Sequence, residues 1–286
     1  MTSQADATPL LKGQNNDAGQ PSPAAPRWLA DRAVTANVVA FALNFAVVGA
    51  SNFGLWGKTN KDVSDSIPTL TTPAAYAFSI WGLIFTSETA LVVWQALPRN
   101  AGNLAVKQGL GPWFAAACVL QAVWSIAFAQ EALTLSAVIL VGIAVCLGKA
   151  SANLAGFRAR GAAWFDHLIL HAPIGLHAGW TCAAALVNIN LAAAQTSGVA
   201  AQVTAAIVTV FAAAAAAAVY GVVLLDPAFL AAVVWALAAI VANDGGYRDA
   251  LLGKEVARGL TGAITVIWVG LLALQVVAVA ARRLRK

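Results

Sequence analysis

Four side chains on one predicted helix have the types and the spacing of a binding site inside a membrane. Phe78, Trp81, Phe85 and Glu88 follow one another at intervals of three, four and three residues, which places them on one face of a helix. The three rings could stack on a flat apolar molecule. Because a carboxylate is costly in hydrocarbon, Glu88 is expected to face the protein interior, where it could bind a cation, carry a proton or hold a polar ligand group. The alternative is ordinary helix packing, with Glu88 hydrogen-bonded across the bundle.

A second group of such residues lies on the predicted helix over 165–193. His177, Trp180 and Asn188 share one face of it if the helix stays regular after Pro173. An imidazole offers one donor and one acceptor, so His177 could contact a ligand. The alternative is a hydrogen bond to a neighbouring helix.

Two further histidines, His167 and His171, stand four residues apart and next to Asp166. This spacing puts both imidazoles on one helix face and makes them weak candidates for a transition metal or a haem edge. No HExxH motif or cysteine pair supplies a third ligand, so we assign no metal site. A proton relay and ordinary histidines hydrated at a helix end are the alternatives.

The elements that must position these residues are membrane-spanning helices. The chain has 286 residues, of which 60% are hydrophobic and 10% charged, and its mean hydropathy is +0.75. Soluble domains have about 25% charged residues, so a soluble globular protein is excluded. The ten-residue alternating segments of a membrane barrel do not occur. We therefore predict an all-α integral membrane protein with the lipid bilayer as its surroundings and no nucleic-acid partner.

The hydrophobic pattern predicts about eight transmembrane helices. They cover 33–53, 73–97, 112–130, 132–153, 165–193, 199–224, 227–243 and 258–281. Twelve lysines and arginines fall in the segments that share a side with the N-terminus, and five fall on the other side. The positive-inside rule then places both termini in the cytoplasm.

The ends of the chain are read as tails. Residues 1–32 are polar and proline-rich, which predicts a disordered cytoplasmic tail, and 282–286 form a basic cytoplasmic tail. The sequence from Asp6 to Leu11 is similar to an acidic dileucine sorting signal, which would indicate an endomembrane or vacuolar membrane; the plasma membrane is the alternative.

Alanines 212–218 would allow close helix packing, and a homo-oligomer fits such small-residue faces.

The stretch from Ser51 to Phe85 resembles the long-chain branch of the tryptophan-rich sensory protein family, which is related to translocator protein (TspO/MBR) and the peripheral benzodiazepine receptor. The matching elements are Gly57-Lys58-Thr59, Thr72-Pro73-Ala74 and the nine residues 77–85. Two further segments agree less specifically. They are 120–125, which contains Trp124 and has glutamine in place of an expected asparagine, and 173–188, where His177 stands in place of an expected aromatic residue.

The resemblance implies a five-helix membrane domain over 33–194 with a ligand cavity below the first loop. Residues 195–281 would be three additional transmembrane helices with no counterpart in the compact family members. Family members are associated with tetrapyrroles, sterols and similar amphipathic molecules, so the resemblance implies a tetrapyrrole ligand, and we assign no cofactor. The expected ligand-binding residues are Phe78, Trp81, Phe85, Glu88, Trp124, His177, Trp180 and Asn188.

These observations predict a protein that binds an amphipathic small molecule, and that senses or transports it. The chain has no phosphate-cradling loop and no nucleophile elbow, and we expect no enzyme. The rival hypothesis is an ion- or proton-coupled secondary transporter that uses Glu88, Lys149 and the histidines inside the membrane.

Overall fold

The computed structural model describes residues 31–100, 102–158, 165, 167–243 and 246–284. In this part of the chain the elements are helices joined by short turns, without a strand. The predicted all-α fold is confirmed. The main helices are α2 (Arg32–Asn52), α4 (Ile80–Ala96), α5 (Gly111–Ala129), α6 (Leu133–Arg158), α8 (Ala172–Thr196), α9 (Val199–Ala218), α10 (Pro227–Ala242) and α12 (Lys254–Leu284).

Shorter elements connect or extend these helices. Two short helices in loops, α3 (Asn60–Ser66) and α11 (Tyr247–Leu252), were not predicted from the sequence. A 3₁₀ turn, η1 (Ala75–Ser79), leads into α4, and another, η2 (Pro98–Asn100), follows it. Turns of π-helix adjoin three main helices: η3 (Ala105–Leu110) before α5, η4 (His167–His171) before α8 and η5 (Val219–Val223) after α9.

Seven of the described helices are long and apolar enough to cross a membrane. They correspond to the predicted spans, with boundary corrections. The third begins at 105 rather than 112 because η3 extends it, and the last begins at 254 rather than 258. The predicted span 227–243 is α10, which has only 16 residues. At 1.5 Å per residue it is about 24 Å long, shorter than a hydrocarbon core of about 30 Å.

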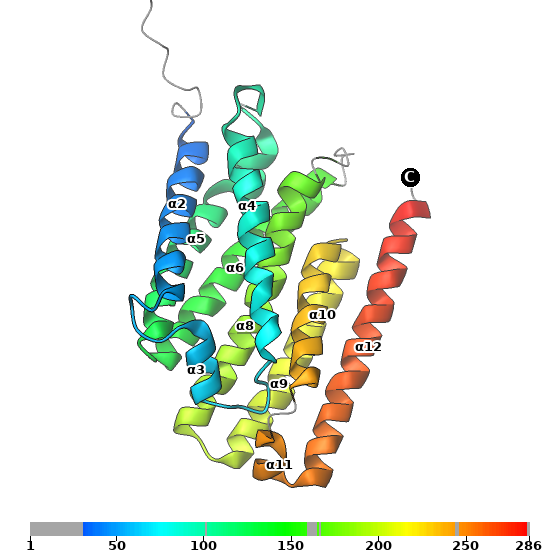
Figure 1. Ribbon diagram of the computed structural model, residues 1–286. Coiled ribbons are helices and arrows are strands. Elements are labelled where there is room, and N and C mark those ends of the chain that lie inside the picture. The colour runs from blue at the N-terminus through cyan, green and yellow to red at the C-terminus, as the bar shows by residue number, and fades with distance from the viewer. Residues whose placement is uncertain (1–30, 101, 159–164, 166, 244–245, 285–286) are drawn as a thin grey trace, which may run out of the picture.

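The helices run alternately up and down, so that the start of α2 and the end of α12 lie at the same end of the bundle (Figure 1). We call this the terminal end. The opposite end carries α3 and α11 and is called the α11 end (Figure 1). An even number of passes explains this arrangement. Of the two tails predicted at 1–32 and 282–286, residues 1–30 and 285–286 lie outside the described residues. Residues 282–284 belong to the end of α12 and Arg32 begins α2, so these residues were wrongly assigned to tails.

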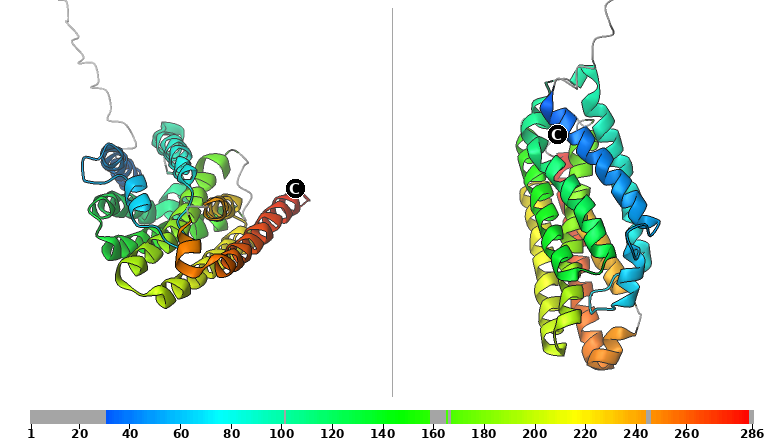
Figure 2. Two further views of the ribbon diagram at one scale, coloured as in Figure 1. Left: turned by 60° about the horizontal axis from the view of Figure 1, so that its bottom comes forward. Right: turned by 90° about the vertical axis from the view of Figure 1, so that its left-hand side faces the viewer.

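Helix α8 occupies the middle of the bundle. It packs most extensively against α6 and α10 and also contacts α4 and α9, and it is the most buried of the spanning helices. Helix α12 lies at the outer edge (Figure 2), and its apolar residues are mostly exposed on the bundle surface, as expected of a helix that faces lipid. Since α10 packs on α8, the C-terminal helices and the first five form one packed bundle.

Helices α8 and α10 approach closely because α8 presents glycines to α10. A Cβ atom added at Gly179 would lie 2.9 Å from the backbone C and Cα atoms of Phe229. A Cβ atom at Gly175 would collide with the carboxylate of Asp226, which caps α10 by accepting a hydrogen bond from the backbone N–H of Phe229 at 3.2 Å. Small residues at such crossings let helix backbones meet where no hydrophobic effect drives association.

Replacing Gly179 with alanine is expected to destabilise the protein by about 1–3 kcal/mol, because the new methyl group must push α10 away from α8. Thermal unfolding in lipid nanodiscs measures the loss. Gly262→Ala on α12 is the matched control, since nothing lies within 4 Å of its added Cβ and alanine favours a helix over glycine. Equal melting temperatures of Gly179→Ala and the unmodified protein would contradict this account of the crossing.

Candidate functional site

A small cavity of about 50 Å³ lies between η1, α4, α5, α8 and α10, beneath α3. Its aromatic wall consists of Phe78, Trp81, Trp124, Phe128 and Trp180. Helix α3 closes the cavity toward the α11 end with Asn60 and Ser64, and α10 contributes Ala236 and Ile240. The cavity therefore draws on both the first five helices and the C-terminal ones.

The rings around the cavity meet mainly edge to face. The centroids of Trp81 and Trp180 are 6.1 Å apart with their planes at 88°, and those of Phe78 and Trp180 are 6.5 Å apart at 84°. Trp124 and Phe128 are stacked at 5.0 Å. Edge-to-face and offset-stacked pairs are the favourable arrangements of aromatic rings, so this wall is well packed.

Polar groups in the wall are few, and two of them are donors without an acceptor. The indole N–H groups of Trp124 and Trp180 are buried and have no hydrogen-bond partner among the described residues. By contrast, the side chain of Asn188 accepts a hydrogen bond from the Ser136 hydroxyl at 2.7 Å. A buried donor without a partner costs about 1–3 kcal/mol, so an acceptor brought by a ligand would be favourable here.

Glu88 and His177 form a buried pair that links α4 to α8. Glu88 Oε1 and His177 Nδ1 are 2.7 Å apart, and both side chains are completely inaccessible to solvent. Glu88 Oε2 and His177 Nε2 have no hydrogen-bond partner in the described part of the chain. The sequence hypothesis that Glu88 faces the interior agrees with this position.

The pair stands beside the cavity without lining it. The Trp81 ring lies edge to face with the imidazole of His177, at a centroid distance of 5.6 Å, and also belongs to the cavity wall. Trp81 thus stands next to both features. Of the eight predicted ligand-binding residues, Phe78, Trp81, Trp124, Trp180 and Asn188 line the cavity.

Phe85 faces a different hollow. It lines an open groove of about 500 Å³ between α2 and α4, together with Phe45 and Trp81. The predicted stripe is therefore divided: Phe78 and Trp81 face the cavity, Trp81 and Phe85 face the groove, and Glu88 pairs with His177. One indole, that of Trp81, belongs to both hollows.

The remaining histidines lie in η4, where the rings of His167 and His171 are 5.6 Å apart. The described residues contain no group of three histidine, cysteine or carboxylate side chains that could hold a metal ion. Asp166, which the sequence analysis placed beside them, is outside the described residues. Lys149 is exposed on α6, nine residues before that helix ends.

Sequence reasoning missed two buried amide pairs between helices. Asn37 of α2 donates to Gln95 of α4 at 3.1 Å, and Asn44 of α2 donates to Gln121 of α5 at 3.2 Å. The seven-residue spacing of Asn37, Asn44 and Ser51, all three buried, was the signal that could have revealed a polar seam on α2. Gln121 is the glutamine that replaces the asparagine of the resembled pattern.

The C-terminal helices fix the segment that carries Phe78 and Trp81. Asn243 donates to the Thr72 carbonyl at 2.9 Å, and the Ala74 N–H donates to the Ala239 carbonyl at 2.9 Å. Farther along, the indole N–H of Trp235 donates to the Ala77 carbonyl at 3.1 Å. These bonds determine where η1 and α4 begin, and so where the aromatic wall stands.

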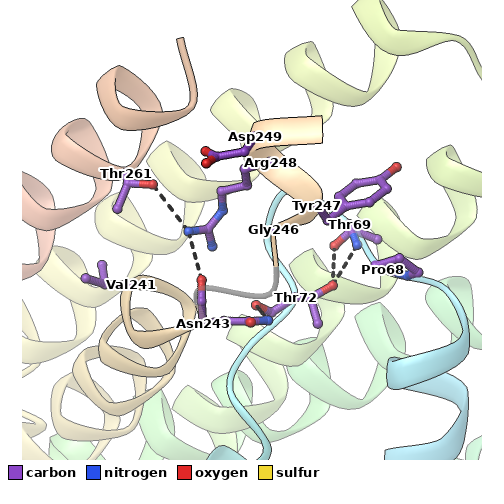
Figure 3. A pocket seen from close by; sticks show the side chains of 10 residues that line it. All are labelled: Pro68, Thr69, Thr72, Val241, Asn243, Gly246, Tyr247, Arg248, Asp249 and Thr261. Carbon is purple, nitrogen blue, oxygen red and sulfur yellow. Dashed lines mark hydrogen bonds between the residues drawn. The ribbon is translucent and has the colours of Figure 1, made fainter. Parts of the chain in front are cut away.

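Arg248 of α11 strengthens this connection at the α11 end. Its guanidinium group donates to the carbonyls of Leu70 at 2.9 Å and Ile240 at 2.6 Å, and to the hydroxyl of Thr261 at 3.3 Å. Figure 3 shows the side chain reaching across a polar hollow of about 250 Å³ toward Asn243 and Thr261. Burial lowers the pKa of the guanidinium from its usual value. Arg248 thereby ties the first loop to α10 and α12.

Arg248→Gln is expected to destabilise the protein by about 2–5 kcal/mol, because hydrogen bonds from charged groups contribute about 1.5–3 kcal/mol each and two strong ones are lost. Arg258→Gln on α12 is the control, since Arg258 is exposed. Thermal unfolding of both variants in nanodiscs provides the comparison. Equal melting temperatures of Arg248→Gln and Arg258→Gln would show that the contacts of Arg248 do not stabilise the first loop.

Comparison with known proteins agrees with the packing of the first five and the C-terminal helices into one bundle. A family model described as "TSPO-like protein" matches residues 34–280. The match runs through the C-terminal helices as well as the first five, which fits their shared packing. Searches among curated proteins and among solved structures found no match. The match over most of the chain establishes that this integral, multi-pass membrane protein belongs to the TSPO-like protein family.

Proposed function

We propose that this protein binds an amphipathic small molecule of tetrapyrrole or sterol type in the aromatic cavity. The observation that carries the proposal is the pair of buried indole N–H groups, of Trp124 and Trp180, which lack an acceptor in a mostly apolar wall. Such a wall suits a flat apolar body that carries one or two acceptor oxygens. Stacking and edge contacts with the rings would bury the body of the ligand.

Binding requires the cavity to enlarge. Ligand pockets measure about 300–1,000 Å³, well above the roughly 50 Å³ of this cavity. Two boundaries are suited to movement. One is α3 with its loop, which is held to the α5–α6 turn by an exposed ion pair between Lys58 and Glu131, worth about 0–1 kcal/mol, and by a hydrogen bond from the Lys58 N–H to the Ala129 carbonyl at 3.1 Å. The other is Trp81, on whose far side lies the α2–α4 groove.

The orientation in the membrane follows from the same charge argument as before. Arg32, Arg99 and Lys107 belong to the terminal end and Lys149 to the terminal half of α6, whereas Lys58, Lys61, Arg248, Lys254 and Arg258 belong to the α11 end. By the positive-inside rule the terminal end faces the cytoplasm. A ligand that enters through α3 would then come from the opposite side.

Phenylalanine at Trp124 or Trp180 retains an aromatic ring and removes the N–H group. We expect each change to weaken the binding of metal-free protoporphyrin about 5- to 20-fold, the equivalent of one hydrogen bond of about 1–2 kcal/mol. Quenching of the remaining tryptophans in nanodiscs measures the affinity. Trp113→Phe, on a part of α5 outside the cavity wall, is the control. Affinities that match the control in both variants would remove the cavity as the binding site.

A second candidate function, proton-coupled transport, is favoured by the Glu88–His177 pair. A fully buried acid and imidazole 2.7 Å apart can exchange a proton without contact with solvent, and ionisable groups inside membranes often mark proton pathways. The π-helical turn before Pro173 also provides a break at the start of α8, as is common in transporters.

If this second function holds, liposomes that contain the protein should accumulate protoporphyrin when a pH gradient is imposed. Glu88→Gln should abolish the gradient-driven part of the uptake, because an amide cannot exchange the proton, and should leave equilibrium binding within about threefold. Uptake that is independent of the gradient, or equal in Glu88→Gln, would exclude proton coupling through this pair.

A further inference from the structure

The polar hollow at the α11 end holds a positive charge that no described carboxylate balances. Arg248 forms no ion pair with the described residues, whereas three more exposed lysines, Lys58, Lys61 and Lys107, each pair with a carboxylate. Charged groups are seldom removed from water without a partner of opposite charge. The missing counter-charge therefore points to an anionic ligand.

The guanidinium group of Arg248 makes two firm hydrogen bonds and two weak ones. Nη2 donates to the Ile240 carbonyl at 2.6 Å, and Nε donates to the Leu70 carbonyl at 2.9 Å. Nη1 donates to the Asn243 carbonyl at 3.4 Å and to the Thr261 hydroxyl at 3.3 Å, beyond the usual range of about 2.7–3.2 Å. The first two bonds fix the side chain, and the other two can be exchanged for a better acceptor.

All four acceptors of Arg248 are neutral. Carbonyl and hydroxyl dipoles solvate a guanidinium group, but they leave its unit charge in place. One N–H of Nη2 also has no acceptor among the described residues, because the group has five donors and makes four bonds. An oxyanion that accepts from Nη1 and Nη2 together would satisfy this donor and balance the charge, in the bidentate geometry for which arginine is suited.

Hydroxyl groups border the same hollow from two other elements. Thr72 belongs to the segment before η1, and Thr261 belongs to α12 (Figure 3). Thr72 Oγ1 accepts a hydrogen bond from the Thr69 N–H at 2.7 Å, and the hydroxyl oxygens of these two residues are 3.1 Å apart. When the Thr69 hydroxyl donates to Thr72, the Thr72 proton is available to a ligand. The Thr261 hydroxyl accepts from Arg248 and can turn its own proton toward the hollow.

We propose that this hollow binds a phosphate-class oxyanion through Arg248, Thr72 and Thr261. Donors from three elements surround the hollow, which suits a tetrahedral anion better than a planar carboxylate. The volume of about 250 Å³ is slightly below the roughly 300–1,000 Å³ of pockets for drug-sized ligands, as expected for a headgroup or a small ion. The site is separate from the aromatic cavity, since the two share no lining residue.

Such an oxyanion could come from a lipid headgroup or from free phosphate. Helix α12, which contributes Thr261, has 31 residues, more than the roughly 20 that cross the hydrocarbon core. Its first turns therefore extend to the level of lipid headgroups. Arg248 lies on α11, which is outside the spanning helices, so a dissolved ion could also reach it.

One carboxylate in the wall opposes an anion. Asp249 lines the hollow and is exposed, so water screens its charge, but the repulsion should still weaken anion binding. Removing this charge should therefore change the affinity in the opposite direction from removing a donor. The two kinds of variant together distinguish an anion site from a merely structural arginine.

The test is calorimetric titration of the full chain in a maltoside detergent, which contains no phosphate. Inorganic phosphate and a short-chain phosphatidate are the two ligands, at matched ionic strength. Thr261→Val should weaken the binding of the tighter ligand about 5- to 10-fold, the equivalent of one hydrogen bond. Asp249→Asn should strengthen it about threefold, as expected for one screened charge.

Arg248→Gln should abolish binding, and the other two variants keep the test valid if the loss of Arg248 unfolds the protein. Arg258→Gln is the matched control, since Arg258 is exposed on α12 and is not in the wall of the hollow. Its affinity should stay within about twofold of the unmodified protein. Tighter binding of phosphatidate would identify a lipid headgroup as the source, and equal or tighter binding of inorganic phosphate would identify the free ion.

Three results would overturn the inference and leave the proposed function standing. The first is a dissociation constant above about 10 mM for both ligands. The second is an affinity that neither Thr261→Val nor Asp249→Asn changes. The third concerns Asp244, which lies outside the described residues: phosphate binding that occurs only in Asp244→Asn would show that the chain itself supplies the counter-charge of Arg248.

Discussion

A polar group inside an apolar bundle must find its partner within the bundle, and this constraint explains most of the interior. Lipid offers no hydrogen bonds, and several of the buried polar side chains tie two helices together. Asn37 joins α2 to α4, Asn44 joins α2 to α5, and Glu88 joins α4 to α8. The atoms that lack partners are then the informative ones. Two of them are the indole N–H groups of the cavity wall, and a third is His177 Nε2.

The C-terminal helices matter because they complete what the first five helices begin. Helix α10 is too short to cross a membrane easily, yet half of its sixteen residues are buried. It lines the cavity and receives the segment before α4 through hydrogen bonds of Ala239 and Trp235. A short helix held between α8 and α12 serves this purpose better than a lipid-facing one, because its ends can bond to neighbouring loops within the protein. The aromatic wall is therefore a property of the whole bundle.

Helix periodicity predicted the fold and much of the cavity, since composition determines which segments are apolar and spacing determines which residues share a face. It placed Phe78 and Trp81 together on the cavity wall, but it did not separate Trp180, which lines the cavity, from His177, which pairs with Glu88 instead. It could not show what each face meets. Phe85 shares the face of Trp81 but opposes α2, and the 3₁₀ turn before Ile80 changes the angle between Phe78 and the rest of the stripe. The Glu88–His177 pair and the contacts of Arg248 join residues 89 and 178 positions apart, where only tertiary packing decides.

The division of the stripe also explains why one residue can serve two hollows. An α-helix places residues seven apart nearly in line, so Glu88 lies two turns from Trp81 on the same side. The imidazole of His177 enters from α8 and fills the space between them, in contact with both. Trp81 is therefore confined by a rigid, hydrogen-bonded pair on one side, while two hollows adjoin it on others. A large side chain with empty space on two sides and a fixed neighbour on the third is free to move in only a few directions.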